Sequence, residues 1–386
     1  MKIFITIPWF LPAYRAGGPV QSIANLVEHY REGVTYYIFC GDVDVNGAAL
    51  EVVTGNWLDY NPHTKVWYAA PQKISDALVK QTEVIKPDIL FIVGMFSWHY
   101  NIVPLIYGKA GKKILSSRGM LHPGALAQKK WKKRIFLELF RLFEYQYKVV
   151  FHATDAAEAQ FIQEYFGEKS MVHIAGNFPN EIGALPRMYK EKGALKLASI
   201  GLISPMKNIL AVLQSLAMVQ GEVQYDIYGA IKDEDYWDSC RRQIETLPQN
   251  IKVIAHREIE PCRVAEALQQ THVFILPSES ENFGHALYEA LSAGRPVITS
   301  HRTPWNHLQV ASAGINVSPG DHDGVAAAIN TFISMDDDTF AAWHTGALQY
   351  AAAATDRPLL TEQYRQLFQI ELNGADMATI KTNDTI

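Results

Sequence analysis

The feature that most constrains the fold of this chain is a series of short, β-rich apolar runs that alternate with helical patterns. In the first half, the runs lie at residues 2–8, 34–40, 89–95 and 112–119. The series starts again at residue 195 and continues at residues 223–229, 251–256, 271–277, 295–300 and 313–319. Short apolar runs separated by helices indicate a parallel sheet covered on both faces. Two successive α/β units of similar size are therefore predicted, with a boundary in the Gly-, Pro- and charge-rich segment 175–194.

Composition excludes several classes of protein. The net charge of -5 gives no general attraction to nucleic acid. The three cysteines are scattered without metal-ligand spacing and fit a reducing cytosol. The apolar N-terminal run is too short for a secretory signal, and no run of about 18 apolar residues would span a membrane. A cytoplasmic location is therefore expected.

Residues 277–305 carry the most specific chemistry in the second half. A buried strand is predicted to end at Pro277, followed by a helix with Asn282 as its N-cap and Gly294 at its end. The free N–H groups and partial positive charge of such a helix start suit a phosphate. Gly284 would let a ligand approach that backbone closely.

Two glutamates, Glu281 and Glu289, stand on either side of this predicted helix start, with seven residues between them. Glu289 lies about two turns into the helix, where its carboxylate is able to accept hydrogen bonds from the vicinal hydroxyls of a ribose. Glu281 lies in the preceding loop, where it would meet another group near the phosphate. Taken alone, the two acids fit solvated surface positions better, because charged side chains are usually exposed.

Together with other segments, this region resembles the retaining GT-B glycosyltransferases of family 4, which include sucrose-synthase-like and lipopolysaccharide or capsule sugar transferases. The two glutamates match the E-x7-E signature of these enzymes. Segments 17–28, 116–140 and 199–209 resemble further motifs of one bacterial branch. The resemblance runs from residue 17 to about residue 305 and covers most of the chain.

The resemblance implies a GT-B fold, an α/β architecture in which two Rossmann-like doubly wound domains face each other across a cleft. Residues 1–178 would form the acceptor domain, with a C-terminal helix at about 358–386 packing back against it. Residues 179–357 would bind the donor, a UDP- or GDP-sugar. The implied reaction moves the sugar, with retention of its anomeric configuration, to a hydroxyl of a surface-polysaccharide or lipid-linked saccharide.

The resemblance also implies residue roles by position. Glu289 would bind the ribose, and Glu281 would lie beside the donor sugar and phosphates. Lys207 would neutralise the diphosphate as the glycosidic bond breaks, so that Glu281 and Lys207 form the catalytic pair. The remaining donor-binding residues would be Asn282, Phe283 and Gly284, with Gly17 and Gly18 in the first domain.

The first domain offers weaker signals. Gly17 and Gly18 precede a predicted helix, so their bare backbone is able to approach a phosphate, although Gly-Gly is also common in plain turns. Arg118 follows a predicted strand, and the resemblance turns it toward the cleft, where it would bind an acceptor or a phosphate. An ion pair with a nearby acid is the alternative role for Arg118.

The chain departs from the family pattern at two positions. Leu202 stands where an arginine is usual, and Val93 stands where many members have a histidine. Arg118 or Arg15 would then have to supply the second cation for the diphosphate. These departures keep open a catalytically weak paralogue that acts as a binding partner. A nucleotide-sugar 2-epimerase on the same fold is another alternative.

No Asp-x-Asp motif falls at a predicted cleft position, so neither a metal nor another cofactor is expected. Residues 128–148 are predicted to form a basic amphipathic helix. Its basic residues gather in the first turns, at Lys129, Lys130, Lys132, Lys133 and Arg134, and an apolar stripe follows at Trp131, Ile135, Leu139 and Leu142. Peripheral contact with the inner face of a membrane is one interpretation. The other is an ordinary domain helix whose apolar stripe faces the core.

Overall fold

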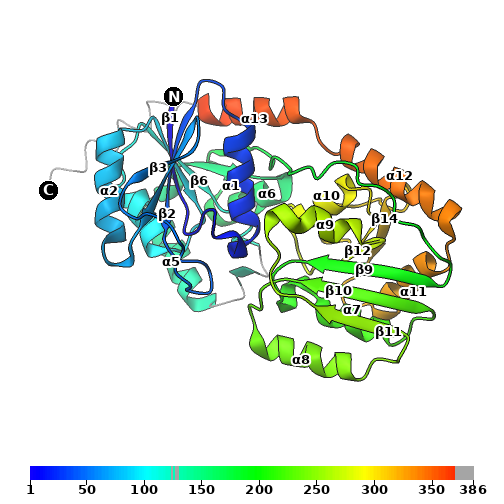
Figure 1. Cartoon of the computed structure of the whole chain (residues 1–386). Helices are drawn as coiled ribbons and strands as arrows, with labels where there is room; N and C mark the ends of the chain where they lie inside the picture. Colours follow the sequence, from blue (N-terminus) through cyan, green and yellow to red (C-terminus); the bar gives the residue numbers. More distant parts are fainter. Residues whose placement is uncertain (123–124, 127–129, 370–386) are drawn as a thin grey trace. The chain divides into compact units, whose positions relative to one another are not determined.

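The computed structural model describes residues 1–122, 125–126 and 130–369. These residues form two compact units (Figure 1). The first comprises Met1–Phe178 and the described residues from Arg357 onward, and the second comprises Pro179–Asp356. The described chain therefore enters the second unit once, leaves it once, and returns to the first.

The first unit contains a sheet whose strand order is β3-β4-β2-β1-β5-β6-β7-β8. Its strands are β1 (Lys2–Thr6), β2 (Thr35–Gly41), β3 (Trp57–Asn61), β4 (Thr64–Ala69), β5 (Ile89–Val93), β6 (Lys112–Ser116), β7 (Val150–Ala153) and β8 (Val172–Ile174). Every neighbouring pair is parallel except β3 and β4, which form an antiparallel edge.

Helices cover both faces of this sheet. They are α1 (Gly18–His29), α2 (Ile74–Ile85), α3 (Val103–Tyr107), α5 (Lys130–Leu142), α6 (Ala156–Phe166) and α13 (Arg357–Gln369). Alternate residues of β1 enter different cores: Ile3 and Ile5 pack in one cluster and Phe4 in the other. A strand buried on both faces has to be continuously apolar, which explains the run predicted from the sequence.

Helix α13 belongs to the first unit although it follows the second in the chain. Its residues Tyr364, Leu367 and Phe368 are part of the core cluster that contains Ile3 and Ile5. Lys112 Nζ donates to the carbonyl oxygens of Leu367 and Phe368 at 3.3 and 2.8 Å, near the carboxyl end of the helix. The part of the expected C-terminal helix beyond residue 369 lies outside the described residues.

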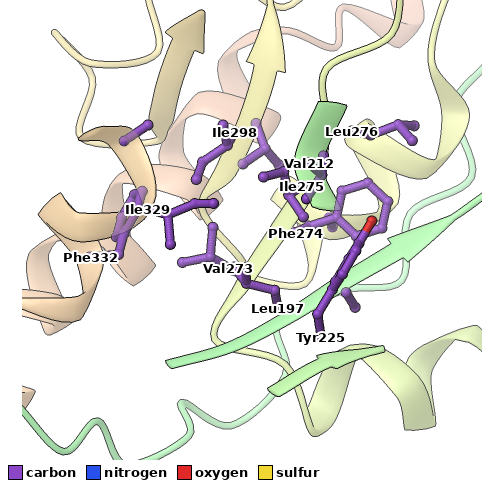
Figure 2. Packing of buried hydrophobic residues seen from close by; sticks show 14 of the residues in the cluster. Leu197, Val212, Tyr225, Val273, Phe274, Ile275, Leu276, Ile298, Ile329 and Phe332 are labelled. Carbon is purple, nitrogen blue, oxygen red and sulfur yellow. The ribbon is translucent and has the colours of Figure 1, made fainter. Parts of the chain in front are cut away.

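The second unit contains a sheet of parallel strands in the order β11-β10-β9-β12-β13-β14. Its strands are β9 (Ala194–Ile200), β10 (Glu222–Tyr228), β11 (Ile251–Ala255), β12 (Val273–Leu276), β13 (Val297–Ser300) and β14 (Gly314–Val317). Its helices are α7 (Ile209–Leu216), α8 (Glu234–Glu245), α9 (Val264–Gln269), α10 (His285–Ser292), α11 (His322–Ile333) and α12 (Asp337–Ala353). Figure 2 shows strand residues such as Val273 and Ile298 packed with Ile329 and Phe332 of α11.

The structure adds elements that the sequence analysis did not predict. Each of the ten predicted runs overlaps a strand, whereas β3, β4, β7 and β8 were not predicted. The hairpin β3–β4 is amphipathic, and β3 has no fully buried residue, so neither strand is a continuous apolar run. None of the described helices is both long and apolar enough to cross a membrane.

Candidate functional site

The connection from β12 to α10 is the centre of the candidate site. The sequence predicted a helix start at Asn282, and this prediction was wrong: α10 begins at His285, with Gly284 as its N-cap. Gly284 has φ 76° and ψ 58°, the left-handed region that favours glycine. Because the helix starts later, Asn282 and Phe283 belong to the loop, and Glu289 lies in the second turn of α10.

Glu281 and Lys207 form an ion pair. Lys207 ends a short 3-10 helix, η5 (Pro205–Lys207), that follows β9, and Glu281 follows β12. Strands β9 and β12 are parallel neighbours, so the segments after their carboxyl ends meet at the same edge of the sheet. The Ser278 hydroxyl donates to Glu281 Oε1 at 2.7 Å. The side chains of Lys207 and Glu281 are 22% and 11% exposed, so the pair is reachable from solvent but largely shielded from it.

Glu289 has a different environment. Its Oε1 accepts a hydrogen bond from Asn180 Nδ2 at 3.0 Å. Burial raises the pKa of Glu289 to about 7, and the bond from Asn180 opposes that shift in part. Near neutral pH this carboxyl group therefore exists in both forms, and donors that hydrogen-bond to it would favour the ionised one.

Aromatic side chains fix the loop that carries Phe283 and Gly284. Trp305 Nε1 donates to the carbonyl oxygen of Phe283 at 2.6 Å, and the two rings meet edge to face with centroids 5.3 Å apart. A Cβ atom on Gly284 would lie 3.0 Å from Leu287 Cδ1 and 3.2 Å from Trp305 Nε1. The backbone that carries the amides of Phe283 and Gly284 is therefore held in place, and it leaves little room for a side chain at Gly284.

A polar and aromatic group lies at the β10–β11 edge of the same sheet. His256 Nε2 contacts Asp226 Oδ1 at 2.7 Å, and the His256 ring stacks on Tyr228 with centroids 4.2 Å apart and planes 5° from parallel. The sequence analysis had not identified Asp226, Tyr228, Ser278 or Asn180. The first two alternate along β10 as residues i and i+2 on one face, a signal that the strand pattern contained.

In the first unit, the predicted residues lie at strand-to-helix connections. Gly17 is the N-cap of α1, with φ 79° and ψ -143°, and Gly18 is the first residue of that helix. Arg118 follows β6 with φ 50°, and its Nη1 donates to Asn177 Oδ1 at 2.5 Å. Arg15, the other candidate for the second diphosphate cation, pairs with Asp44 at 3.4 Å.

Glu158 is the centre of a buried hydrogen-bond network around the residues next to Arg118. Glu158 accepts hydrogen bonds from Ser117 Oγ and Gly119 N, both at 2.6 Å, and two at 2.8 Å from Thr154. Burial alone would raise the pKa of Glu158, but these hydrogen bonds outweigh burial and lower it. The ionised Glu158 therefore fixes the residues on either side of Arg118.

His152 lies in the same region and is neutral. Burial first, and then the Arg118 cation, lower its pKa to about 3. Its ring nitrogens contact Ser116 Oγ and the carbonyl oxygen of Ala175, each at 2.8 Å. Val93, which stands where many members of the resembled family have a histidine, is the last residue of β5. His99 is the first histidine after this strand, and it contacts Ser75 Oγ at 2.7 Å. Within the described part of the chain, no three His, Cys, Asp or Glu side chains gather as a metal site would require.

Comparison with known proteins finds a family that the second unit resembles. Residues 186–345 match the family described as Glycosyl transferases group 1. This match covers most of the second unit and includes Lys207, Glu281 and Glu289. The chain is also 30% identical over 147 residues to the O-antigen chain mannosyltransferase B of Escherichia coli. That alignment covers 36% of this chain and 37% of the relative, so the chain is matched to little more than a third of that protein.

Solved structures resemble the chain over nearly its whole length. The sucrose-phosphate synthase from Thermosynechococcus elongatus has a TM-score of 0.67 at 16% identity, with 95% of this chain and 98% of that one covered. Anabaena HepE in complex with UDP and glucose has a TM-score of 0.67 at 16% identity, with 95% and 99% covered. These likenesses confirm the predicted fold class: the chain has a GT-B fold, α/β, with two sheets of mostly parallel strands.

Proposed function

We propose that this chain is a retaining glycosyltransferase that moves a sugar from a UDP- or GDP-sugar to a hydroxyl of a surface-polysaccharide or lipid-linked saccharide. The Glu281–Lys207 ion pair carries the proposal. It lies after the carboxyl ends of neighbouring parallel strands, where open α/β sheets bind their ligands. It also lies inside the segment that matches the group 1 glycosyl transferases. The relative's name, an O-antigen mannosyltransferase, supports a saccharide acceptor.

In this mechanism Lys207 stabilises the leaving diphosphate. Negative charge grows on a phosphate oxygen as the glycosidic bond breaks, and a fixed ammonium group stabilises that charge more in the transition state than in the ground state. Glu281 holds the Lys207 ammonium in place. Since Glu281 also accepts from Ser278, the lysine is positioned before the donor arrives. The acceptor hydroxyl would attack on the face that the diphosphate leaves, and a phosphate oxygen would take its proton.

The other proposed site residues would each bind a different part of the donor. Glu289 would accept hydrogen bonds from the ribose, and the amides of Phe283 and Gly284, with Asn282 beside them, would meet the sugar or phosphates. Tyr228 is the last residue of β10, and His256 and Arg257 follow β11; the base would bind at the stacked rings of Tyr228 and His256. In the first unit, Gly17 and Gly18 would approach a phosphate, and Arg118 the acceptor or a phosphate.

The finer parts of the proposal concern place and cofactor. Residues 1–178 with the C-terminal helix would bind the acceptor, and residues 179–357 the donor. The reaction would need no obligatory metal, because a lysine supplies the positive charge. The enzyme would act in the cytoplasm, in peripheral contact with the inner face of the membrane through residues 128–148, of which 128 and 129 lie outside the described residues.

The test is an acceptor-free assay of donor binding and slow donor hydrolysis. Calorimetry with a panel of UDP- and GDP-sugars should find one donor that binds and whose diphosphate is released over time. Lys207→Ala should lower the release rate by about tenfold or more while the melting temperature stays near that of the wild type. NMR of the released sugar should show the donor's own anomeric configuration at early times.

Three results would count against the proposal. Binding of no nucleotide sugar would favour the binding-partner alternative, which Leu202 motivates. Inversion of the C2 configuration of the sugar would favour an epimerase. Wild-type turnover in Lys207→Ala would remove the lysine from the mechanism.

A further inference from the structure

Helix α5 leaves a long apolar row uncovered. Trp131, Ile135, Leu139 and Leu142 follow one another at helical spacing, and their exposed fractions are 65%, 52%, 46% and 71%. Phe143 continues the row at 58%. Side chains three and four residues apart lie on the same face of a helix, so these five form one continuous strip, here called the α5 strip.

The α5 strip does not hold the helix to its domain, because a different face does. Leu137 and Phe140 are buried at 7% and 2% exposure. Phe140 packs on Phe166 with ring centroids 5.0 Å apart, and Phe136 meets Phe96 at 5.4 Å. The interpretation that the stripe at Trp131, Ile135, Leu139 and Leu142 faces the core was therefore wrong. The helix has two apolar faces, and the described residues cover one of them.

Cations border the α5 strip. Residues 130–148 contain six basic and two acidic side chains, a net charge of +4 in a chain whose total is -5. Lys132 and Arg134 are exposed beside the first turn of the strip, and Lys132 Nζ lies over the Trp131 ring at 5.3 Å. Arg141 is exposed beside its far end and pairs with Glu138 at 4.0 Å. Positive charge is thus concentrated where apolar surface is uncovered.

Neighbouring elements add further aromatic and basic side chains near α5. Tyr107, at the end of α3, is 57% exposed, and it contributes to the raised pKa of Tyr145, which comes mainly from burial. Burial first, and then the nearby cations Lys109 and Lys148, lower the pKa of Lys113 to about 8. Lys109, Lys148 and these tyrosines therefore gather around the carboxyl-terminal end of α5.

We propose that the α5 strip docks on an anionic phospholipid surface, with its apolar side chains in the headgroup region and the flanking cations on lipid phosphates. A helix that is apolar on one side and basic beside it binds such a surface both by burying apolar side chains and by electrostatic attraction to anionic lipids. Tryptophan and tyrosine prefer the membrane interface, and lysine and arginine are able to extend their charged ends toward headgroups. A protein partner is the less favoured occupant, because protein interfaces are depleted in lysine.

Docking at this face deepens the proposed function. A lipid-linked acceptor is presented at a bilayer surface, so a docked enzyme would meet it there; this step rests on the proposed function. The docking itself rests only on the α5 strip and its cations. Membrane binding is therefore measured separately from sugar transfer.

The test is co-sedimentation of the full chain with vesicles of phosphatidylcholine alone or mixed with phosphatidylglycerol. The wild type should bind the mixed vesicles and lose binding as salt is raised, because salt screens exposed charges. The pair Ile135→Ser with Leu139→Ser should weaken partitioning by about tenfold or more, since it removes apolar area from the strip. The pair Lys132→Glu with Arg134→Glu should weaken it at least as much on mixed vesicles.

The matched controls lie on α2 of the same unit. Val84 is 63% exposed there and Lys80 is also exposed, so Val84→Ser and Lys80→Glu change the same kinds of surface away from α5. Both controls should bind vesicles like the wild type. Donor binding without vesicles should be unchanged in all the variants, which separates failure of docking from failure of the proposed function.

Three results would overturn the docking proposal. The first is equal binding of the wild type and both α5 variants to mixed vesicles, and the second is no binding of the wild type to them. The third is a wild type that self-associates in solution without binding vesicles, and that the serine pair renders monomeric; the strip would then cover a second copy of the chain.

Discussion

The two units use the ends of their sheets differently. In the second unit, Lys207 and Ser278 both contact Glu281, and Glu289 follows Glu281 in the next helix. In the first unit, Gly17 and Arg118 lie on separate connections, and each is held by its own neighbours. Ser278, Glu281 and Glu289 belong to one strand-loop-helix segment and so keep a fixed spacing in the sequence, whereas Lys207, Gly17 and Arg118 each come from another connection. Under the proposed function, this difference would suit a second unit that binds the donor and a first unit that binds the acceptor.

The largest effect is expected at Glu158, where the first unit depends on one buried carboxylate. Glu158→Gln replaces one acceptor oxygen with an amide that faces donors, and hydrogen bonds to a charged group contribute about 1.5–3 kcal/mol each. We expect a loss of about 3 kcal/mol in the free energy of unfolding, measured by urea denaturation. The control, Glu164→Gln, alters an exposed residue of the same helix and should change little. Equal midpoints for both variants would mean that the network is dispensable.

The sign of the pH dependence sharpens this prediction. The pKa of Glu158 is lowered in the folded state, so its stabilisation is present above the ordinary pKa of 4.5 and is lost as the pH falls through the folded value. Acid should therefore narrow the difference between the wild type and Glu158→Gln. A difference that stays constant on acidification would show that charge on Glu158 is not its source.

The next effect separates the cations of the two units. Lys207→Ala should lower the turnover number by about tenfold or more, because its ammonium acts on a charge that grows in the transition state. If Arg118 binds the acceptor rather than a phosphate, Arg118→Ala should instead raise the KM for the acceptor with a smaller change in turnover. Steady-state kinetics with a saccharide acceptor measures both. The comparison fails if Arg118→Ala lowers turnover as much as Lys207→Ala does at saturating acceptor.

The two N-cap glycines should differ by a smaller amount. Gly17 has ψ -143° at φ 79°, a region that is nearly exclusive to glycine, whereas Gly284 is in the left-handed helical region that asparagine tolerates. Gly17→Ala should cost about 1–3 kcal/mol and Gly284→Ala about 1 kcal/mol. Thermal denaturation tests the order, and a reversed order would contradict the backbone argument.

The smallest effect is a pH dependence of donor affinity. Ribose hydroxyls that donate to Glu289 favour its ionised form, so affinity should rise as the pH passes through about 7. Calorimetry with an intact nucleotide sugar should show about fivefold to tenfold weaker binding one pH unit below that value than one unit above it. Glu289→Gln should bind with little dependence on pH. A wild type without this slope would argue against ribose binding by Glu289.

The free protein should show the opposite trend at this residue. The folded pKa of about 7 lies above the ordinary 4.5, so the folded state retains a proton that the unfolded state releases between those values. The stability of the second unit should therefore fall as the pH rises from about 4.5 to about 7, and then stay level. Glu289→Gln should remove this decline in thermal unfolding experiments.

The predictable part of the fold is the part with strong periodicity. Strands such as β5 and β12 are buried on both faces and appear in the sequence as unbroken apolar runs. The hairpin β3–β4 lies at the edge and depends on cross-strand aromatic packing, as between Trp57 and Trp67 at 5.5 Å. Such long-range packing is invisible to a local pattern, so the hairpin was not predicted.

The candidate site shows the same limit. The spacing of Glu281 and Glu289 could be recognised in the sequence, and so could Lys207, but their partners could not. Asn180 lies far from Glu289 in the chain and reaches it only in the folded unit. The wrong N-cap prediction at Asn282 has a local cause. Asparagine is a common N-cap, but Trp305 binds the Phe283 carbonyl oxygen, and the helix begins only at His285, with Gly284 as its N-cap.

Helix α5 shows that a pattern alone does not tell which of two apolar faces is inward. The strip that includes Trp131 and the buried face that includes Phe140 both have helical spacing. The choice between them depends on which partners exist elsewhere in the unit, such as Phe166. The sequence therefore predicted the helix but not its orientation.

The position of α13 has a consequence for how the protein is made. Tyr364, Leu367 and Phe368 fill the core of a unit whose other residues leave the ribosome first. The second unit, Pro179–Asp356, is continuous and is complete before that helix emerges. The unit that is synthesised first would therefore be the last to reach its final packing. During synthesis the apolar surface around β1 would stay exposed, and accessible to chaperones, until α13 is made and packs on it.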